Sequence, residues 1–267
     1  MKIGVCLKQV PDSETRVKIN ADGSGIVTDD IKWIINPYDE FALEASLQLK
    51  EQGKADGVVL LTMGGKAAEP RIKDGIARGI KVGVEAVRLD DDAFAGSDAL
   101  GTARILAAAA QKAGCDLVLC GKQAIDDDNA QVPAMIAEFM GCAQVTVVDK
   151  IDVEGGTVTA NRVMGGGSVD TVQAALPAVV TCEKGLNTPR FASLPGIMKA
   201  KRAKIAVWGV ADLGLDASQV GSAGALVETG TYTQPPARPE GRIIDGGSPE
   251  EKVATLVRLL RDEAKVI

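Results

Sequence analysis

A polar stretch in the middle of the chain has the residue types of a nucleotide-binding loop. Residues 117–131 read LVLC followed by GKQAIDDDNAQ, and a new helical pattern begins directly after them. This order indicates a strand that delivers a loop to a helix N-terminus. Backbone N–H groups and the helix dipole would bind phosphate, Lys122 would add charge, and Gln123 and the acids would bind a base or ribose. The alternative interpretation is a solvated turn capped by Asp128 or Asn129.

The sequence lacks the parts that would make this loop catalytic. It contains neither S-G-G-x-D-S nor G-x-x-x-x-G-K-[ST], the patterns of ATP-consuming phosphate loops. It also contains no histidine, the commonest general base and transition-metal ligand. Residues 126–128 are three acids that could bind Mg²⁺, but consecutive loop acids are mostly solvated or capping, and we predict no metal site. A nucleotide bound here would be structural, and a nucleotide-hydrolysing enzyme is the alternative from another class.

The composition is that of an ordinary globular protein. The chain has 267 residues, 46% of them hydrophobic, and a formal net charge of -6. Its length predicts one large domain or one domain with an appendage, and the charge makes nucleic acid an unexpected partner. The five cysteines form no C-x-x-C pair, and no apolar run approaches the roughly 20 residues that span a bilayer. We expect a cytoplasmic protein.

Strands and helices that alternate at short spacing would position the loop. Short apolar runs at 2–8, 58–61, 86–89 and 117–120 are predicted strands, and helical patterns cover 40–50, 67–78, 98–113 and 132–140. Continuous apolar strands separated by helices are typical of a parallel sheet covered on both faces. The predicted fold is therefore α/β, an open, mostly parallel, Rossmann-like sheet with helices on both faces.

Four segments should converge at one edge of this sheet. They are residues 6–9 at the end of the first strand, residues 36–39, residues 63–65 and the 121–131 loop. Strand ends that carry glycines, amides and acids make a mononucleotide crevice. Each segment is a weak signal alone, since Gly64 and Gly65 could form only a tight turn and Asn36 could be only a helix cap.

The second half of the chain has shorter β-rich segments and longer irregular stretches than the first half. Short β-rich pieces from about residue 143 to 182 predict a small antiparallel addition to the domain formed by residues 1–182. Residues 183–204 are polar and irregular, and residues 205–267 form an extended arm that ends in a helix at about 249–262 and would pack on a partner. Within 183–204 lie apolar residues beside a basic run, which suits docking; the alternative is a surface loop that folds its own hydrophobic residues back down.

Several motifs resemble the electron transfer flavoprotein β subunit. They are VCLKQVPD at 5–12, NPYD at 36–39, GKQAIDDD at 121–128, LPAVVT at 176–181, and the run from 186 to 201 with LN-x-PR and SLP-x-IMKAK. Because the motifs occur in order from residue 5 to residue 201, the resemblance covers nearly the whole chain and is highly specific.

The resemblance implies a heterodimer in which an α subunit holds most of a redox-active FAD and the β subunit covers one side of the flavin. The β subunit's own crevice would hold AMP without turnover, and this chain would be an electron carrier rather than an enzyme. By motif, the AMP contacts fall on Cys6, Asn36, Pro37, Tyr38, Asp39, Met63, Gly121, Lys122, Gln123, Ala124, Ile125, Asp126, Asp127, Asp128, Asn129, Ala130, Gln131 and Val132. The resemblance also implies that acyl-CoA dehydrogenases dock on this chain and that their electrons pass through the flavin to a quinone-reducing acceptor. The docking residues fall on a recognition loop with Leu194, Pro195, Ile197, Met198, Lys199 and Lys201.

The chain departs from the family pattern at two places. Residues 162–170 keep only Asp170 of the acids that family members carry there, so electrostatic gating of the flavin from this segment is not expected. Residues 12–14 read Asp-Ser-Glu where many members place a tyrosine, which leaves Ser13 to face the flavin. An alternative within the family is electron bifurcation, in which a second FAD replaces AMP; Asp127 stands where those relatives carry a glycine, and this favours AMP.

Overall fold

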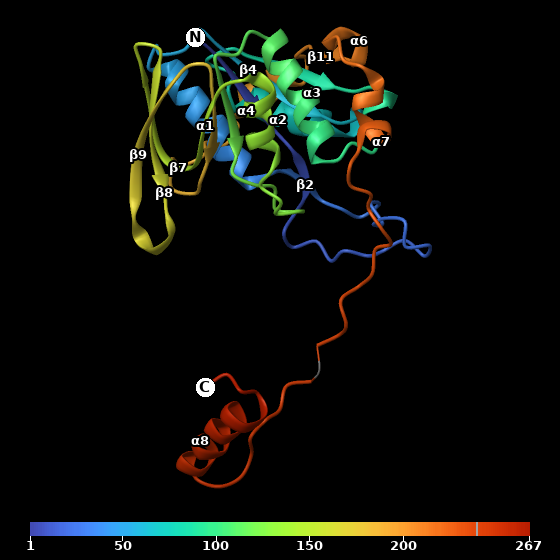
Figure 1. The fold of residues 1–267 in the computed structure, drawn as a ribbon, viewed down its shortest axis with the longest axis vertical. Helices are drawn as coiled ribbons and strands as arrows, with labels where there is room; N and C mark the ends of the chain where they lie inside the picture. Colours follow the sequence, from blue (N-terminus) through green and yellow to red (C-terminus); the bar gives the residue numbers. More distant parts are fainter. Residues whose placement is uncertain (239) are drawn as a thin grey trace. The chain divides into compact units, whose positions relative to one another are not determined.

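The computed structural model describes residues 1–238 and 240–267 and is built on a mixed sheet with helices on both faces (Figure 1). The strand order in the large sheet is β11-β5-β4-β1-β6-β10-β7-β8-β9, and β2 and β3 form a separate antiparallel pair. The strands are β1 (Lys2–Cys6), β2 (Gln9–Pro11), β3 (Trp33–Ile35), β4 (Gly57–Met63), β5 (Val84–Leu89), β6 (Leu117–Gly121), β7 (Ala143–Glu154), β8 (Thr157–Val163), β9 (Val169–Ala175), β10 (Ala178–Cys182) and β11 (Ala206–Trp208).

The helices follow the predicted alternation in the first half of the chain. They are α1 (Pro37–Glu51), α2 (Glu69–Arg78), α3 (Ala99–Lys112), α4 (Val132–Met140), α5 (Leu194–Ala200), α6 (Val210–Leu213), α7 (Gly221–Gly224) and α8 (Pro249–Arg258). The α/β fold predicted from the sequence, with a mostly parallel sheet, is confirmed.

The alternation of buried side chains along β4 shows why both faces of the sheet are covered. Val58 and Leu60 pack in one hydrophobic cluster with the buried face of α1 and α2, and Val59 and Leu61 pack in a second cluster with α3 and α4. A strand buried on both faces reads as a continuous apolar run because both sets of alternating side chains are apolar. This explains the sequence GVVLLTM, whose five central residues are buried.

The chain changes direction across the sheet between β1 and β6. From β1 it proceeds through α1, β4, α2 and β5 toward one edge, and it then returns through α3 to place β6 on the other side of β1. In open α/β sheets the crevice for a ligand lies at the carboxyl ends of the strands that flank such a switch point. The carboxyl ends of β1 and β6 are therefore the structural position of a binding site.

The β-rich half differs from the prediction in the placement of one strand. Residues 178–182 belong to the parallel part of the sheet, because β10 pairs in parallel with both β6 and β7. Only β8 and β9 and the second half of β7 form the antiparallel addition. Short apolar pieces do not reveal strand direction, so the sequence could not separate β10 from its neighbours.

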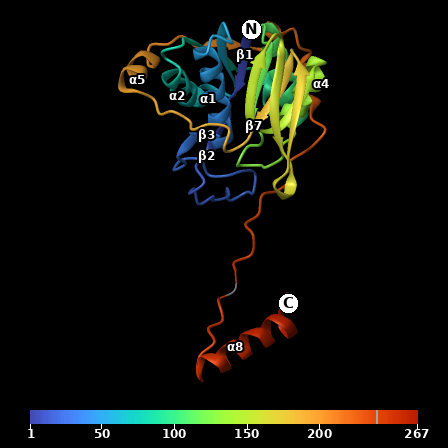
Figure 2. The same cartoon turned by 90° about the vertical axis from the view of Figure 1, so that its left-hand side faces the viewer.

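Strand β7 bends sharply where it leaves the parallel part. Val147 has φ of 59°, and the pairing register with β8 shifts between Val148 and Lys150. Beyond the bend, Asp152 forms an ion pair with Lys54, and Val153 lies in the same hydrophobic cluster as Leu43 of α1. The addition therefore packs against the α1 side of the main body (Figure 2).

The segment after β1 also departs from the prediction. The strand predicted over residues 2–8 ends at Cys6, and Gln9–Pro11 then forms β2, a strand that was not predicted and that pairs with β3 in the register Val10 to Ile34. Val10 is fully buried, which explains why a three-residue strand is stable at this position. Residues 21–25 read ADGSG, the composition of a hairpin turn, and the segments on either side are joined by a hydrogen bond from the Val27 N–H to the Lys18 carbonyl.

Up to Gly230, the last third of the chain contains more helix and strand than the sequence predicts. Residues 194–200 form α5, and residues 206–208 form β11, which pairs in parallel with β5 at the edge of the sheet. The chain divides into two units, and the smaller one consists of residues 19–25 and 231–267. In that unit, the expected helix α8 begins with a capping box between Ser248 and Glu251. It continues beyond Arg258 as a π-helical turn over Leu259–Glu263, so the predicted end near 262 is confirmed. Residue 239 of the predicted arm lies outside the described residues.

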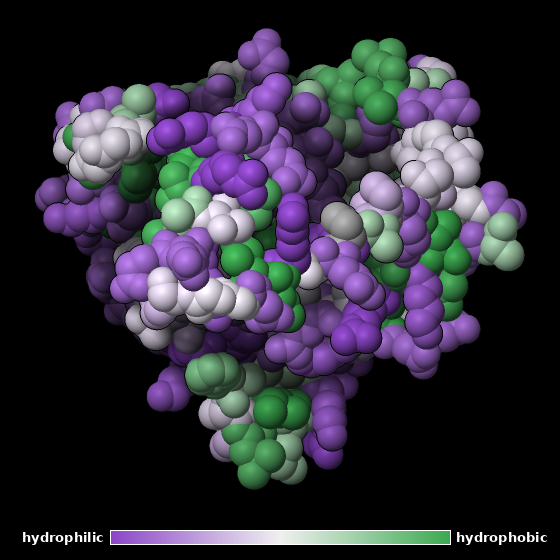
Figure 3. All heavy atoms as spheres, turned by 90° about the horizontal axis from the view of Figure 1, so that it is seen from below, coloured by the Kyte–Doolittle hydropathy of each residue, from purple (hydrophilic) through white to green (hydrophobic). Residues whose placement is uncertain are grey.

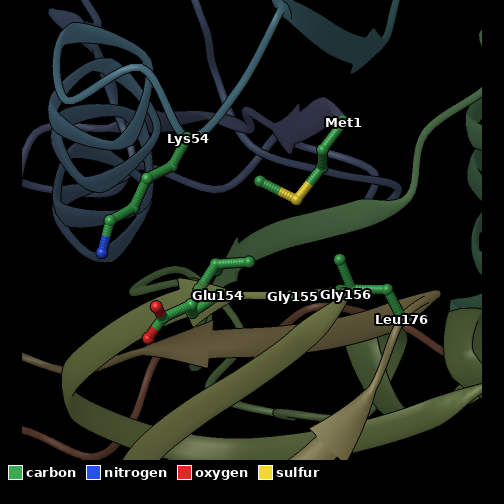
Figure 4. A pocket seen from close by; sticks show the side chains of 7 residues that line it. Met1, Lys54, Glu154, Gly155, Gly156 and Leu176 are labelled. Atoms are coloured by element: carbon green, nitrogen blue, oxygen red, sulfur yellow. The ribbon is translucent and has the colours of Figure 1, made fainter.

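The molecular surface in Figure 3 is predominantly hydrophilic, with hydrophobic residues gathered in separate patches. Within residues 1–238 and 240–267, no helix combines the length and apolar character that crossing a membrane requires. A hollow of about 420 Å³ lies beside the amino-terminal ends of β1 and β10, away from the switch-point crevice (Figure 4). It is lined by Met1, Lys54, Val153, Glu154, Gly155, Gly156 and Leu176.

Candidate nucleotide-binding site

The side chain of Asp39 joins the two strands that flank the switch point. Asp39 lies in the first turn of α1, and its carboxylate accepts hydrogen bonds from the backbone N–H of Lys8 at 2.7 Å and of Gly121 at 3.0 Å. The side-chain amide of Asn36 donates a third hydrogen bond at 2.9 Å. Asp39 is 6% exposed, so the carboxylate is buried and each of its oxygens is hydrogen-bonded.

Gly121 allows this close approach. A Cβ atom at this position would lie 2.6 Å from the Cβ of Tyr38 and would also collide with a carboxylate oxygen of Asp39. Such distances are not tolerated, and the obstructing atoms belong to a helix start and a buried carboxylate that have little room to move. The first residue of the predicted loop is therefore required to be glycine by its contact with α1.

Asn36 holds the loop by its backbone. Its side-chain amide donates to the Gln123 carbonyl at 2.9 Å, and its side-chain oxygen accepts the Ile125 N–H at 3.2 Å. The side chain makes no capping bond to α1, so the interpretation of Asn36 as a mere helix cap is wrong. Because Asn36 is 1% exposed, these hydrogen bonds are shielded from water and fix residues 123–125 against the start of α1.

The loop ends at the start of α4, which is left without side-chain caps. Gln131 is the N-cap residue and makes no side-chain capping bond, and the first turn contains no acid. The predicted caps are used differently, since Asp128 accepts a hydrogen bond from the Gln123 side chain at 2.7 Å. The alternative of a turn capped by Asp128 or Asn129 is therefore not what the structure contains. A helix N-terminus with unpaired N–H groups and a positive dipole end attracts anions.

The cations of the crevice differ from the expected one. Lys122 forms an ion pair with Glu183 at 2.5 Å, and its ammonium lies 4.9 Å from the centre of the Tyr38 ring. Lys8 instead faces the loop and pairs with Asp126 at 2.8 Å and Asp127 at 3.0 Å. Burial lowers the pKa of Lys8, but the two carboxylates outweigh it and the net shift is upward, which keeps Lys8 charged. The sequence offered one signal for Lys8, its position directly after the first strand.

The environment of Asp39 favours its neutral form more than is usual. Burial raises the pKa of Asp39 to about 7, although the hydrogen bonds from Lys8, Asn36 and Gly121 act in the opposite direction. The pKa of Cys120 is raised by its hydrogen bond with Cys6 and by burial, and burial raises that of Cys182. Cys120 and Cys182 therefore remain protonated near neutral pH and are not activated nucleophiles.

A second feature, the docking segment of residues 183–204, is fastened to α1. The guanidinium of Arg190 donates to Glu44 at 2.8 Å and 2.9 Å and to Glu51 at 2.6 Å and 2.8 Å. These hydrogen bonds raise the pKa of Arg190, so the guanidinium stays charged. Glu44 is 4% exposed, and a buried carboxylate of this kind requires such a partner.

The apolar residues of the docking segment remain exposed. Leu194 is 72% exposed and Met198 is 64% exposed, while Gly196 lies against the backbone of Ala77 in α2. The alternative in which the segment folds its hydrophobic residues back down does not describe these side chains. The segment therefore presents an apolar surface on a short helix whose underside is packed.

Comparisons with known proteins agree with this arrangement. The electron transfer flavoprotein domain matches residues 24–213. The electron transfer flavoprotein subunit beta of Bradyrhizobium diazoefficiens is 38% identical over 267 residues, which is 100% of both chains. The human protein of the same name is 36% identical over 268 residues and 98% of each chain. The chain belongs to the electron transfer flavoprotein β subunits. Another relative is the caffeyl-CoA reductase-Etf complex subunit CarD of Acetobacterium woodii, 36% identical over 264 residues, 98% of this chain and 99% of its own.

The remaining positions suggested by the electron transfer flavoprotein motifs lie at the same edge of the sheet, with one exception. Cys6 ends β1, Met63 ends β4, and Pro37 and Tyr38 open α1. Gly64, directly after Met63, has φ of 153°, which favours glycine, and its N–H donates to the Leu89 carbonyl. Ser13 lies apart from these residues, exposed in the turn that follows β2.

Proposed function

We propose that this β subunit forms a heterodimer with an electron transfer flavoprotein α subunit and carries electrons from flavin dehydrogenases of the acyl-CoA dehydrogenase type to a downstream quinone-reducing acceptor. The α subunit would hold most of a FAD, which supplies reversible uptake of one or two electrons. The β subunit would cover the flavin with the turn that contains Ser13 and would hold a structural AMP. We assign the chain a carrier role in the cytoplasm rather than an enzymatic one.

The crevice between β1 and β6 carries this proposal. The Asn36 side chain fixes residues 123–125 of the loop, and the start of α4 that follows the loop is uncapped and would bind a nucleotide phosphate. Cys6, Met63 and the first turn of α1 would contact the base and the ribose. The crevice contains no phosphate loop and no histidine, so the nucleotide would stabilise the subunit without being consumed.

A second candidate function is electron bifurcation, with a second FAD in the crevice instead of AMP. The similarity to a subunit of a caffeyl-CoA reductase-Etf complex favours it. The geometry of the loop favours AMP, because Asp127 projects a carboxylate toward Lys8 where a glycine would leave space for a larger ligand.

The nucleotide content of the assembled heterodimer tests the proposal. The full chain is co-expressed with its α subunit, the purified complex is denatured, and the released FAD and AMP are quantified. We expect one FAD and one AMP per heterodimer. Two FAD and no AMP would replace the carrier proposal with bifurcation, and a complex without any adenine nucleotide in the crevice would overturn the assignment of the site.

Docking is tested by Leu194→Ala in the same heterodimer. Removing an exposed apolar anchor should slow reduction by an acyl-CoA dehydrogenase while the FAD content stays unchanged, since anchors of this kind contribute mainly to association. The matched control is Val207→Ala, which trims an exposed apolar residue in β11. Equal slowing by both variants, or loss of flavin from Leu194→Ala, would contradict a docking role.

A further inference from the structure

The ends of β1 and β6 form a position that suits an anion. The backbone N–H of Lys8, two residues after β1, and that of Gly121, the last residue of the adjacent parallel strand β6, both point to the carboxylate of Asp39 in the first turn of α1. Converging backbone N–H groups at the switch point of an α/β sheet, close to a helix N-terminus, are the usual way in which such folds bind a phosphate. The spot therefore has the properties of a phosphate position.

A group of the protein already occupies this spot. One carboxylate oxygen of Asp39 accepts the Lys8 N–H, and the other accepts the Gly121 N–H and the Asn36 amide. The contact is so close that even a methyl group on Gly121 would collide with it. No space for a second anion remains between the two strand ends.

We propose that the Asp39 carboxylate is a built-in anion that takes the phosphate position between β1 and β6. Asp39 is thus a positioning residue of the crevice. The consequence for a ligand rests on the proposed function: a nucleoside monophosphate is denied this position, so the part of the molecule that lies over β1 and β6 is uncharged.

Chemical rescue by a small carboxylate tests the proposal. Asp39→Ala in the co-expressed heterodimer removes the carboxylate and leaves the Lys8 and Gly121 N–H groups facing a cavity. Formate, added at about pH 8 so that it is fully ionised, should enter that cavity and raise the thermal midpoint of the variant in a saturable manner, as a ligand of the native state does. The wild-type complex should show no saturable shift.

Two variants serve as controls. Asp39→Asn fills the same space with a neutral amide, so formate should not raise its midpoint. Asp126→Ala removes an acid of the same crevice that pairs with Lys8 but accepts no backbone N–H from the strand ends, and it should also be insensitive to formate. An equal formate response in wild type, Asp39→Asn and Asp39→Ala would overturn the proposal, as would the absence of any response in Asp39→Ala.

The same preparations separate this inference from the proposed function. AMP is counted in the wild-type and Asp39→Ala heterodimers, the latter with and without formate. An absence of AMP from wild type would overturn the proposed nucleotide site, while the formate response, which needs no nucleotide, would still decide the role of Asp39. Azido substitution on the base of AMP, followed by photolysis, should label peptides that contain residues 6–9 or 36–39; labelling confined to residues 124–132 would overturn the stated orientation.

Discussion

Helices α1 and α4 begin at the same edge of the sheet but differ in what their first turns offer. The first turn of α1 carries Asp39 and Glu40, and Asp39 saturates the N–H groups of the neighbouring strand ends. The first turn of α4 carries no acid, and its N-cap makes no side-chain bond. The backbone N–H groups beside the start of α1 are thus taken by a carboxylate of the protein, whereas the start of α4 has no side-chain cap.

The largest expected effect comes from Gly121→Ala, which disrupts the contact between β6 and the start of α1. The added methyl group would push Asp39 and Tyr38 away from β6, and we expect a loss of about 3 kcal/mol in the free energy of unfolding, the upper part of the range for overpacking. Urea unfolding of the heterodimer measures it. Gly165→Ala is the control, because a Cβ there meets no atom within 4 Å. Similar losses in both variants would show that the close approach to α1 is not responsible.

A somewhat smaller effect is expected for Asn36→Ala, which loosens the link between the two helix starts. The variant leaves the Ile125 N–H and the Gln123 carbonyl without their buried partner and should cost about 2 kcal/mol. AMP retention during dialysis of the heterodimer should fall with it, because the loop in front of α4 is no longer fixed. Retention equal to that of wild type would separate the loop from nucleotide binding.

The pH dependence of the free energy of unfolding reports whether the Asp39 carboxylate at the start of α1 is charged. The pKa of Asp39 is about 7, above its ordinary value of 3.8, so within this window the folded protein binds a proton that the unfolded chain releases. Lowering the pH through the window should therefore stabilise wild type relative to Asp39→Asn, by about 1 kcal/mol per pH unit, and raising it should remove that stability.

Lys8, Cys120 and Cys182, which lie near Asp39, do not titrate in this window. The pKa of Lys8 is raised, which keeps it charged, and those of Cys120 and Cys182 are raised, which keeps both thiols protonated. Parallel unfolding curves for wild type and Asp39→Asn across the window would show that Asp39 does not change its protonation state there.

The smallest effect is expected for Lys8→Met, which removes the two ion pairs between Lys8 and the loop that precedes α4. The two ion pairs of Lys8 are partly exposed, and such pairs contribute less than about 1 kcal/mol. The loss should shrink further at high salt, because salt screens exposed charges. A large, salt-independent loss in urea unfolding would mean that the lysine, rather than Asn36, fixes the loop.

The sequence predicts the bounds of these helices and strands well, but it does not predict which side chains interact with one another. The bounds of α4 are those read from the helical pattern, and the strand before the loop ends one residue later than expected, because hydrophobic periodicity is a local signal. The pairing of Lys122 with Glu183 and the hydrogen bonds from Asn36 to the loop join distant parts of the chain. Residue type alone indicates that such side chains will find partners, and only the fold determines which ones.

The same distinction applies to the candidate site. The sequence identifies Gly121 as the end of a strand. It does not show why glycine is required there, because the contact with Asp39 and Tyr38 depends on how α1 crosses the sheet. Lys8 was passed over in favour of Lys122, because a lysine within the loop looks closer to a ligand than one at the end of another strand. The carboxyl edge of a parallel sheet brings such residues together regardless of their order in the chain.

The docking segment begins after β10, in the interior of the sheet, and ends before β11, at its edge. Both of its ends are thus held by strand pairing, and Arg190 holds it to α1 between them. Residues 191–201 could therefore be exchanged for those of a relative while the crevice and the sheet stay as they are. Under the proposed docking role, this exchange would change which dehydrogenase reduces the flavin.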